Sequence, residues 1–159
     1  SLLWSQSKLL IREISVAKIP TVLHDHINGA YPDNVVQLAT VLPNGFAQVT
    51  LRGSVVVYDD EHFGLWERGR GTTNEHLVDG TKVTLFFRKM ALRETLLPKG
   101  AVARFYGIAE IHKSGPVYDK VWEQMIPIER ERDPDKKGYA VLIKVDRAED
   151  FSGAPLALD

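Results

Sequence analysis

The amino-acid sequence predicts a mainly β protein, an antiparallel barrel of six or seven strands with short peripheral helices. Three observations lead to this fold class. From Val35 onward, apolar residues recur with the period of two that is typical of strands. Turn signals such as Pro43-Asn44-Gly45 separate these apolar segments at short intervals. The strands do not alternate with long helices, so a doubly wound parallel sheet fits poorly.

The first part of the chain predicts an arm, a short helix and a hairpin. Residues 1–19 have irregularly spaced apolar side chains and are expected to form an N-terminal arm or helix. Pro20 then opens a short helix that Asn28-Gly29 closes. Segment 35–42 is nearly all apolar and predicts a strand buried on both faces. Segment 46–52 alternates and predicts its hairpin partner.

A second hairpin follows over residues 54–68, with its turn at Asp59 to His62. Segment 82–88 is a strand, and segment 91–100 is a loop. Segment 101–112 predicts a long strand that contains Gly107.

The last part of the chain predicts a helix, a charged loop and a closing strand. Ser114-Gly115-Pro116 starts a helix with an apolar stripe through Val121 and Met125. Residues 129–138 are expected to be a solvated loop, and residues 139–146 the last strand. The predicted domain therefore spans residues 20–153, and residues 154–159 form a C-terminal tail.

Composition excludes several classes of function. The chain has 159 residues, of which 44% are hydrophobic, which suits one globular domain. Twenty basic and 21 acidic residues leave no basic excess, so neither nucleic acid nor an anionic membrane is an expected partner. The absence of cysteine excludes disulfides, thiolate metal sites and cysteine nucleophiles. No apolar run is long enough to cross a bilayer, and a cytoplasmic location is expected.

The stretch GLWERGRGTTNEHL, Gly64 to Leu77, is the strongest candidate for a binding site. Thr72 and Glu75 have the spacing of a capping box, which predicts a helix that starts at Thr72. The free amides at such a start attract anions, and Arg68 and Arg70 add positive charge. The alternative is an ordinary strand-to-helix turn with solvated arginines. No lysine follows the glycines, so the stretch is not a Walker loop.

No catalytic residue and no metal site are predicted. His24 and His26 do not share a helix face, and the sequence has no third ligand near them. His76 is expected to pack against the barrel. Asp59, Asp60 and Glu61 are expected to form a turn and not an acid–base pair.

The order of these elements resembles the pyridoxamine 5′-phosphate oxidase-like flavin-binding split barrels. The resemblance covers roughly residues 20–153 and rests on the strand AQVTLRG, the stretch LWERGRGTTNEHL and the strand GTKVTLFF. It implies that FMN is the cofactor. The cofactor-binding residues that it implies are Gln48, Val49, Thr50 and Leu51 along the flavin ring, Leu65, Trp66 and Glu67 on the strand leading to the phosphate, and Arg70, Thr72, Thr73 and Asn74 at the phosphate turn.

The resemblance also implies a homodimer with flavin sites at its interface. The aromatics expected to face that interface or the pocket are Trp66, Phe86, Phe87, Phe105, Tyr106 and Trp122. A flavin-dependent oxidoreductase acting on an unidentified small molecule is the expected function. The alternatives are a non-catalytic module that stores or senses flavin, and a barrel that binds another apolar ligand.

One departure from the family pattern concerns the reaction. The vitamin B6 oxidases carry an arginine-lysine pair in the phosphate turn, and here Thr72-Thr73 stand in its place. The chain also ends FSGAPLALD instead of with the family's tryptophan and Arg-Leu end. Oxidation of pyridoxamine phosphate is therefore not the expected activity.

Overall fold

The structure is a computed structural model that describes residues 19–69, 77–156 and 158. The predicted N-terminal arm and the predicted helix start at Thr72 lie outside these residues. The seven strands are β1 (Gln37–Val41), β2 (Ala47–Leu51), β3 (Val56–Asp59), β4 (His62–Glu67), β5 (Lys82–Arg88), β6 (Val102–His112) and β7 (Tyr139–Asp150). The helices are η1 (Thr21–Leu23), α2 (His24–Asn28), η2 (Met90–Leu92), α4 (Pro116–Gln124) and α5 (Pro127–Glu131).

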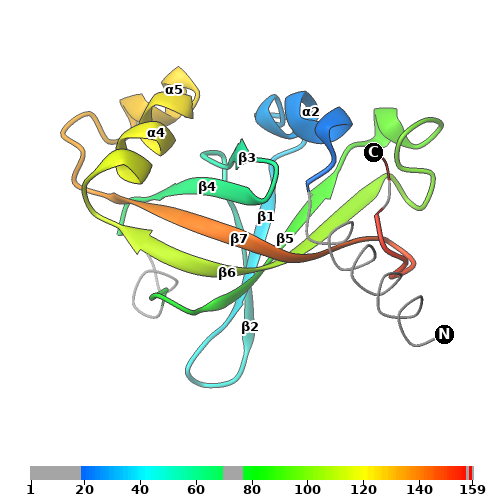
Figure 1. Cartoon of the computed structure of the whole chain (residues 1–159), viewed down its shortest axis with the longest axis horizontal. Helices are drawn as coiled ribbons and strands as arrows, with labels where there is room; N and C mark the ends of the chain where they lie inside the picture. The colour runs from blue at the N-terminus through cyan, green and yellow to red at the C-terminus, as the bar shows by residue number, and fades with distance from the viewer. Residues whose placement is uncertain (1–18, 70–76, 157, 159) are drawn as a thin grey trace, which may run out of the picture.

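All seven strands form one antiparallel sheet in the order β2-β1-β5-β6-β7-β4-β3. The long strands β6 and β7 cross its middle, α4 and α5 lie together at one end, and the β1–β2 hairpin projects away from the body (Figure 1). This arrangement confirms the predicted fold class, a mainly antiparallel sheet with a few short helices.

The short connection between β2 and β3 brings the two edges of the sheet together. Arg52 Nη1 donates to Glu67 Oε2 at the end of β4, at 2.8 Å. Ser54 Oγ accepts from the Trp66 N–H at 3.0 Å and donates to the Trp66 carbonyl at 3.3 Å. Because β2 and β4 lie near opposite edges in the strand order, these bonds curl the sheet into a barrel.

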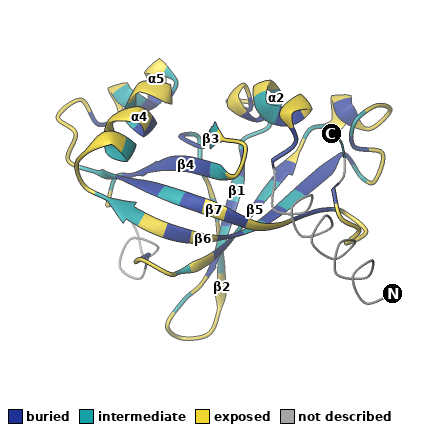
Figure 2. Ribbon diagram, in the orientation of Figure 1, coloured by how far each residue is buried: buried dark blue, intermediate teal, exposed yellow. Residues whose placement is uncertain are grey.

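The core lies on the concave face of this curled sheet. Phe63 and Phe105 meet there edge to face, with ring centroids 4.9 Å apart, and Leu38, Leu85 and Ile143 are fully buried around them. The same strands expose their alternate residues to the other face, which is the pattern of an antiparallel sheet with one covered side (Figure 2).

The β6–β7 pair contains a bulge that depends on Gly107. Tyr106 pairs with Arg147 and Gly107 with Val145, so Asp146 is the extra residue. A Cβ on Gly107 would lie 2.5 Å from Ile143 Cγ2 and 2.7 Å from the Lys144 carbonyl oxygen. Only glycine therefore allows the two backbones to approach this closely.

The structure corrects three sequence predictions. Segment 35–42 is not buried on both faces, because β1 alternates and Val41 at its end is 65% exposed. The charged segment 129–138 is not wholly a loop, because α5 covers its first three residues. Phe87 and Phe105 do not face outward. Both are core residues, and of the four predicted aromatics on these paired strands only Phe86 and Tyr106 are half-buried on the outer face.

Candidate functional site

Strand β2, predicted to lie along a flavin ring, is an edge strand with an apolar outer face. Val49 is 60% exposed and Leu51 is 69% exposed. Gln48 and Thr50 alternate with them and are half-buried on the opposite face. The structure thus divides the four predicted ring-lining residues between the two faces of one strand, so a ligand could meet all four only along the strand edge.

The exposed apolar surface extends over the whole β1–β2 hairpin. Val41, at the end of β1, pairs with Ala47 and is 65% exposed, and Phe46 in the connection is 73% exposed. We call Val41, Phe46, Val49 and Leu51 the hairpin patch. Val41, Val49 and Leu51 lie on one face of the hairpin, because Val41 pairs with Ala47 and alternate residues of β2 share a face. Exposed apolar side chains grouped in this way indicate a binding or interaction site.

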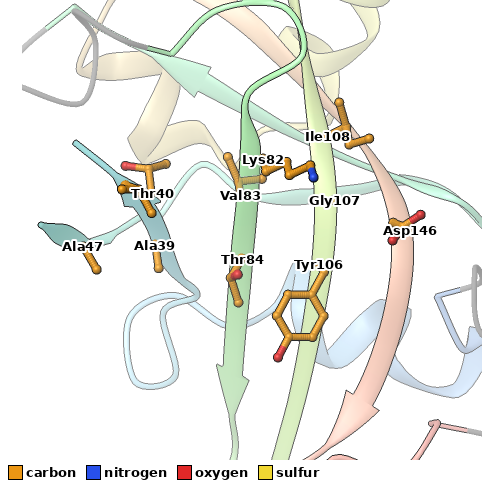
Figure 3. A pocket seen from close by; sticks show the side chains of 11 residues that line it. Ala39, Thr40, Ala47, Lys82, Val83, Thr84, Tyr106, Gly107, Ile108 and Asp146 are labelled. Carbon is orange, nitrogen blue, oxygen red and sulfur yellow. The ribbon is translucent and has the colours of Figure 1, made fainter. Parts of the chain in front are cut away.

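A cavity of about 500 Å³ lies beside the hairpin patch, on the outer face of β1, β5, β6 and β7 (Figure 3). Its walls are mostly apolar and include Ala39, Val41 and Ile108. Figure 3 shows Lys82 reaching from β5 toward β6, with Asp146 on the neighbouring strand β7. The β6–β7 bulge is what adds Asp146 to this face, since bulges redirect side chains.

A second charged group supports the same face. Glu149 is buried and accepts hydrogen bonds from Arg104 Nε at 2.8 Å, the Tyr106 hydroxyl at 2.6 Å and Arg147 Nη2 at 2.8 Å. Burial alone would raise the pKa of Glu149, but these bonds outweigh it and hold the pKa below the ordinary value. The carboxylate therefore stays charged and fixes Tyr106, which lines the cavity.

The predicted phosphate turn begins at a buried ion pair. Glu67 is 1% exposed, and its carboxylate accepts from Arg52 at 2.8 Å and from the Gly69 N–H at 3.2 Å. Arg52 also donates through Nε to Thr50 Oγ1 at 3.0 Å. Burial and the charge of Glu67 raise the pKa of the Tyr139 phenol, which pairs with Glu67 across β4 and β7. Glu67 is thus a buried, ion-paired carboxylate at the start of the turn.

Two other predicted residues of β4 are core residues. Leu65 is fully buried, and Trp66 is 3% exposed with its indole Nε1 donating to Asp133 Oδ2 at 2.8 Å. The Trp66 ring packs against Tyr118 and Trp122 of α4, with centroids 4.9 Å apart in both pairs. Leu65 packs in the barrel core and Trp66 joins α4 to the sheet, which leaves their backbone for any contact with a ligand.

The remaining predicted residues, Arg70, Thr72, Thr73 and Asn74, lie outside the residues that the structure describes, as does His76. Their role in holding a phosphate stays a prediction. Arg68 is the described cation that adjoins the turn, and its charge helps to lower the pKa of Asp133.

Sequence reasoning missed Arg52, Lys82 and Asp146. The sequence could have indicated Arg52, because it lies on the same face of the strand as Gln48 and Thr50. Its charge is also opposite to that of Glu67, which ends the next hairpin. Lys82 and Asp146 meet at the cavity only through strand order and the bulge, neither of which the sequence displays. Among the described residues no group of acidic or histidine side chains has the geometry of a metal site, and no described helix is long and apolar enough to span a membrane.

The chain matches no family model and no curated protein. Solved structures do match. HupZ from Group A Streptococcus is 27% identical, with 86% of this chain and 98% of that chain covered and a TM-score of 0.64. An FMN-binding protein from Syntrophomonas wolfei is 15% identical, with 94% and 96% covered and a TM-score of 0.61.

Two further matches have lower TM-scores. A Clostridium acetobutylicum protein of the pyridoxinephosphate oxidase family, related to general stress protein 26, is 18% identical, with 82% and 88% covered and a TM-score of 0.54. HutZ, the heme storage protein of Vibrio cholerae, is 14% identical, with 79% and 90% covered and a TM-score of 0.51. The chain therefore has the fold of the pyridoxamine 5′-phosphate oxidase-like split barrels, which confirms the resemblance seen in its sequence.

Proposed function

We propose that this protein is a homodimer that binds FMN between its two chains and uses it for redox chemistry on a small molecule. The observation that carries the proposal is the hairpin patch, which exposes four large apolar side chains beside the edge strand β2. The S. wolfei protein of the same fold supports the choice of FMN. Family likeness supports the fold more strongly than the reaction.

A second copy of the chain is the occupant that best fits the hairpin patch and the outer sheet face. The patch residues are 60% to 73% exposed, and Ile108 on the same sheet is 43% exposed. A two-fold axis would bring the same surface of both chains together, so each apolar side chain of the patch would be buried in both chains. Lys82, Asp146 and the half-buried Tyr106 would then lie at the edge of the interface and keep the cavity polar at one end.

The described residues fit a flavin ring along β2. The edge strand offers backbone amides and carbonyls along its open side, and Val49 and Leu51 offer apolar contact. When bound, FMN would supply the electron transfer, while the chain positions the ring and excludes water.

The described residues fit the phosphate of FMN less well than they fit its ring. Arg52 and the Gly69 N–H are suitable donors, and the predicted residues Arg70, Thr72 and Thr73 would add to them. Glu67 already accepts from both described donors. The phosphate would therefore depend most on the turn residues 70–74.

Titration of the purified protein with FMN and with riboflavin, followed by flavin fluorescence, tests the proposal. Hydrogen bonds to charged groups contribute about 1.5–3 kcal/mol each, so FMN should bind at least about tenfold more tightly than riboflavin. Equal affinities would contradict a phosphate site. Hemin serves as a third ligand, because HutZ has the same fold, and binding of hemin without flavin would replace FMN as the proposed ligand.

A redox enzyme is favoured over a non-catalytic flavin module by the cavity beside β2. Its volume of about 500 Å³ lies in the range of small-molecule sites, and it holds one cation and one anion against apolar walls. Anaerobic reduction of the FMN-loaded protein by a nicotinamide cofactor separates the two functions. A loaded protein whose flavin is reduced no faster than free FMN would be a binding module.

A further inference from the structure

Glu67 holds a buried carboxylate at the corner where the β2 edge meets the start of the glycine turn. The side chain is 2% exposed, and that of its partner Arg52 is 13% exposed. The two oxygens are divided between two donors, Oε2 taking the Arg52 guanidinium and Oε1 taking the Gly69 N–H. Gly69 has a φ of 75°, so its backbone turns at this point. The chain thus supplies its own anion at this corner.

We infer that Glu67 is a specificity-determining residue that weakens the binding of a ligand phosphate at this turn. The inference rests on the proposed function, because it concerns the phosphate of the same ligand. The Glu67 carboxylate accepts from Nη1 of Arg52 and from the Gly69 N–H, and its negative charge cancels the positive charge of Arg52. A phosphate arriving here meets a neutral pair instead of a free cation, in a region where buried charges are poorly screened by solvent.

Arg52 is the cation whose charge Glu67 neutralises, so that it is not available to a phosphate. A guanidinium has five N–H groups, and here Nε donates to Thr50 and Nη1 to Glu67. The other described arginine at the turn, Arg68, acts electrostatically on Asp133. Removal of the Glu67 charge would leave Arg52 as an uncompensated cation at the corner, with N–H groups available to a phosphate.

The test compares Glu67→Gln with the wild type in two titrations, one with FMN and one with riboflavin. The two ligands share the ring and differ in the phosphate, so the ratio of their dissociation constants isolates the phosphate contribution. Glu67→Gln should raise the preference for FMN at least about tenfold, nearly all of it through tighter FMN binding. An unchanged or lower preference would overturn the inference.

Glu129→Gln is the matched control. Glu129 has a 7% exposed side chain and pairs with Arg132 at 2.7 Å, so it is a buried, ion-paired carboxylate like Glu67. It lies on α5, whereas the turn follows β4. The control should lose stability as Glu67→Gln does. Its preference for FMN over riboflavin should stay within about threefold of the wild-type value, well short of the tenfold change expected for Glu67→Gln. If the control gained as much preference for FMN as Glu67→Gln, the effect would come from a general loss of stability, and the inference would be overturned.

Loss of one partner from a buried ion pair is strongly destabilising, so a second variant protects the test from misfolding. Arg52→Gln combined with Glu67→Gln leaves no unpaired buried charge. If Glu67 already neutralises Arg52, the double variant keeps the wild-type preference. A preference about tenfold lower would show that Arg52 holds the phosphate despite Glu67, and would overturn the inference. Failure of the wild type to bind flavin would overturn the proposed function as well, whereas binding with an unchanged ratio in Glu67→Gln overturns the inference alone.

Discussion

Replacement of Val49 by aspartate should split the proposed dimer and leave the chain folded. Val49 lies in the middle of β2, is 60% exposed and belongs to the hairpin patch. Its side chain makes little contribution to the core of a single chain, because the core lies on the other face of the sheet. A carboxylate at this position is harmless in a monomer and costly in an apolar interface.

The size of the effect follows from the exposure of Val49 and from two-fold symmetry. Full burial of a valine side chain contributes about 1.5–3 kcal/mol, so covering the exposed 60% contributes roughly 1–2 kcal/mol. An isologous interface contains the residue twice, which doubles the loss to roughly 2–4 kcal/mol. At 1.4 kcal/mol per factor of ten, the dimer dissociation constant rises roughly 30- to 700-fold, before the cost of burying the carboxylate is added.

Light scattering at micromolar concentrations measures the result. We expect a dimeric mass for the wild type, a monomeric mass for Val49→Asp and similar thermal unfolding for both. Val22→Asp is the control, because Val22 is an exposed valine on η1, outside the sheet, at 41% exposure. A monomeric wild type, or a Val49→Asp variant that stays dimeric with the affinity of the control, would refute the assignment of the hairpin patch.

Three further predictions concern the bulge, the Trp66 cluster and the turn. Gly107→Ala should destabilise the chain by about 3 kcal/mol in thermal unfolding, because the added Cβ meets the β7 backbone. The control is Gly80→Ala, which should lose only about 1 kcal/mol, because Gly80 has a φ of 89° and no atom within 4 Å of the added Cβ. Equal losses would argue against the close approach of β6 and β7. Burial would raise the pKa of Asp133, but bonds from Trp66, Gly138 and Lys137 lower it below 3.8, so its stabilising contribution is complete above about pH 4 and is lost as the pH falls through the lowered pKa. Asp133→Asn should therefore flatten the acid limb of the unfolding free energy, and an unchanged limb would contradict this. Arg70→Ala should weaken FMN binding more than Arg68→Ala in isothermal titration, because the Arg68 charge acts on Asp133, and the reverse order would show that Arg68 faces the ligand.

The local sequence pattern was sufficient to predict several secondary-structure elements. Segment 82–88 places Val83, Leu85 and Phe87 on one face and is β5 at the predicted bounds. Ser114-Gly115-Pro116 gives the start of α4, because Gly115 can adopt the φ of 92° found there and the ring of Pro116 fixes φ for the first helical position. Such features depend on neighbouring residues in the chain, which the sequence displays directly.

Features that depend on tertiary contacts were not predictable in the same way. Glu129 and Arg132 suggested a solvated loop, yet Glu129 is 6% exposed and accepts from Arg132 Nη1 at 2.7 Å at the end of α5. The Arg52–Glu67 pair spans 15 positions and exists because the barrel closes there. Phe105 and Tyr106 are equally aromatic, and only strand register decides that the first enters the core and the second faces outward.

The central claim is that FMN binds to a two-chain site with its phosphate at the turn after β4. Titration of FMN into the wild-type protein, with the mass of the complex measured on the same sample by light scattering, tests it most directly. We predict a dimer that binds two FMN molecules and binds riboflavin at least about tenfold more weakly. A monomer that carries stoichiometric FMN, or a dimer that binds neither flavin at micromolar concentrations, would contradict it.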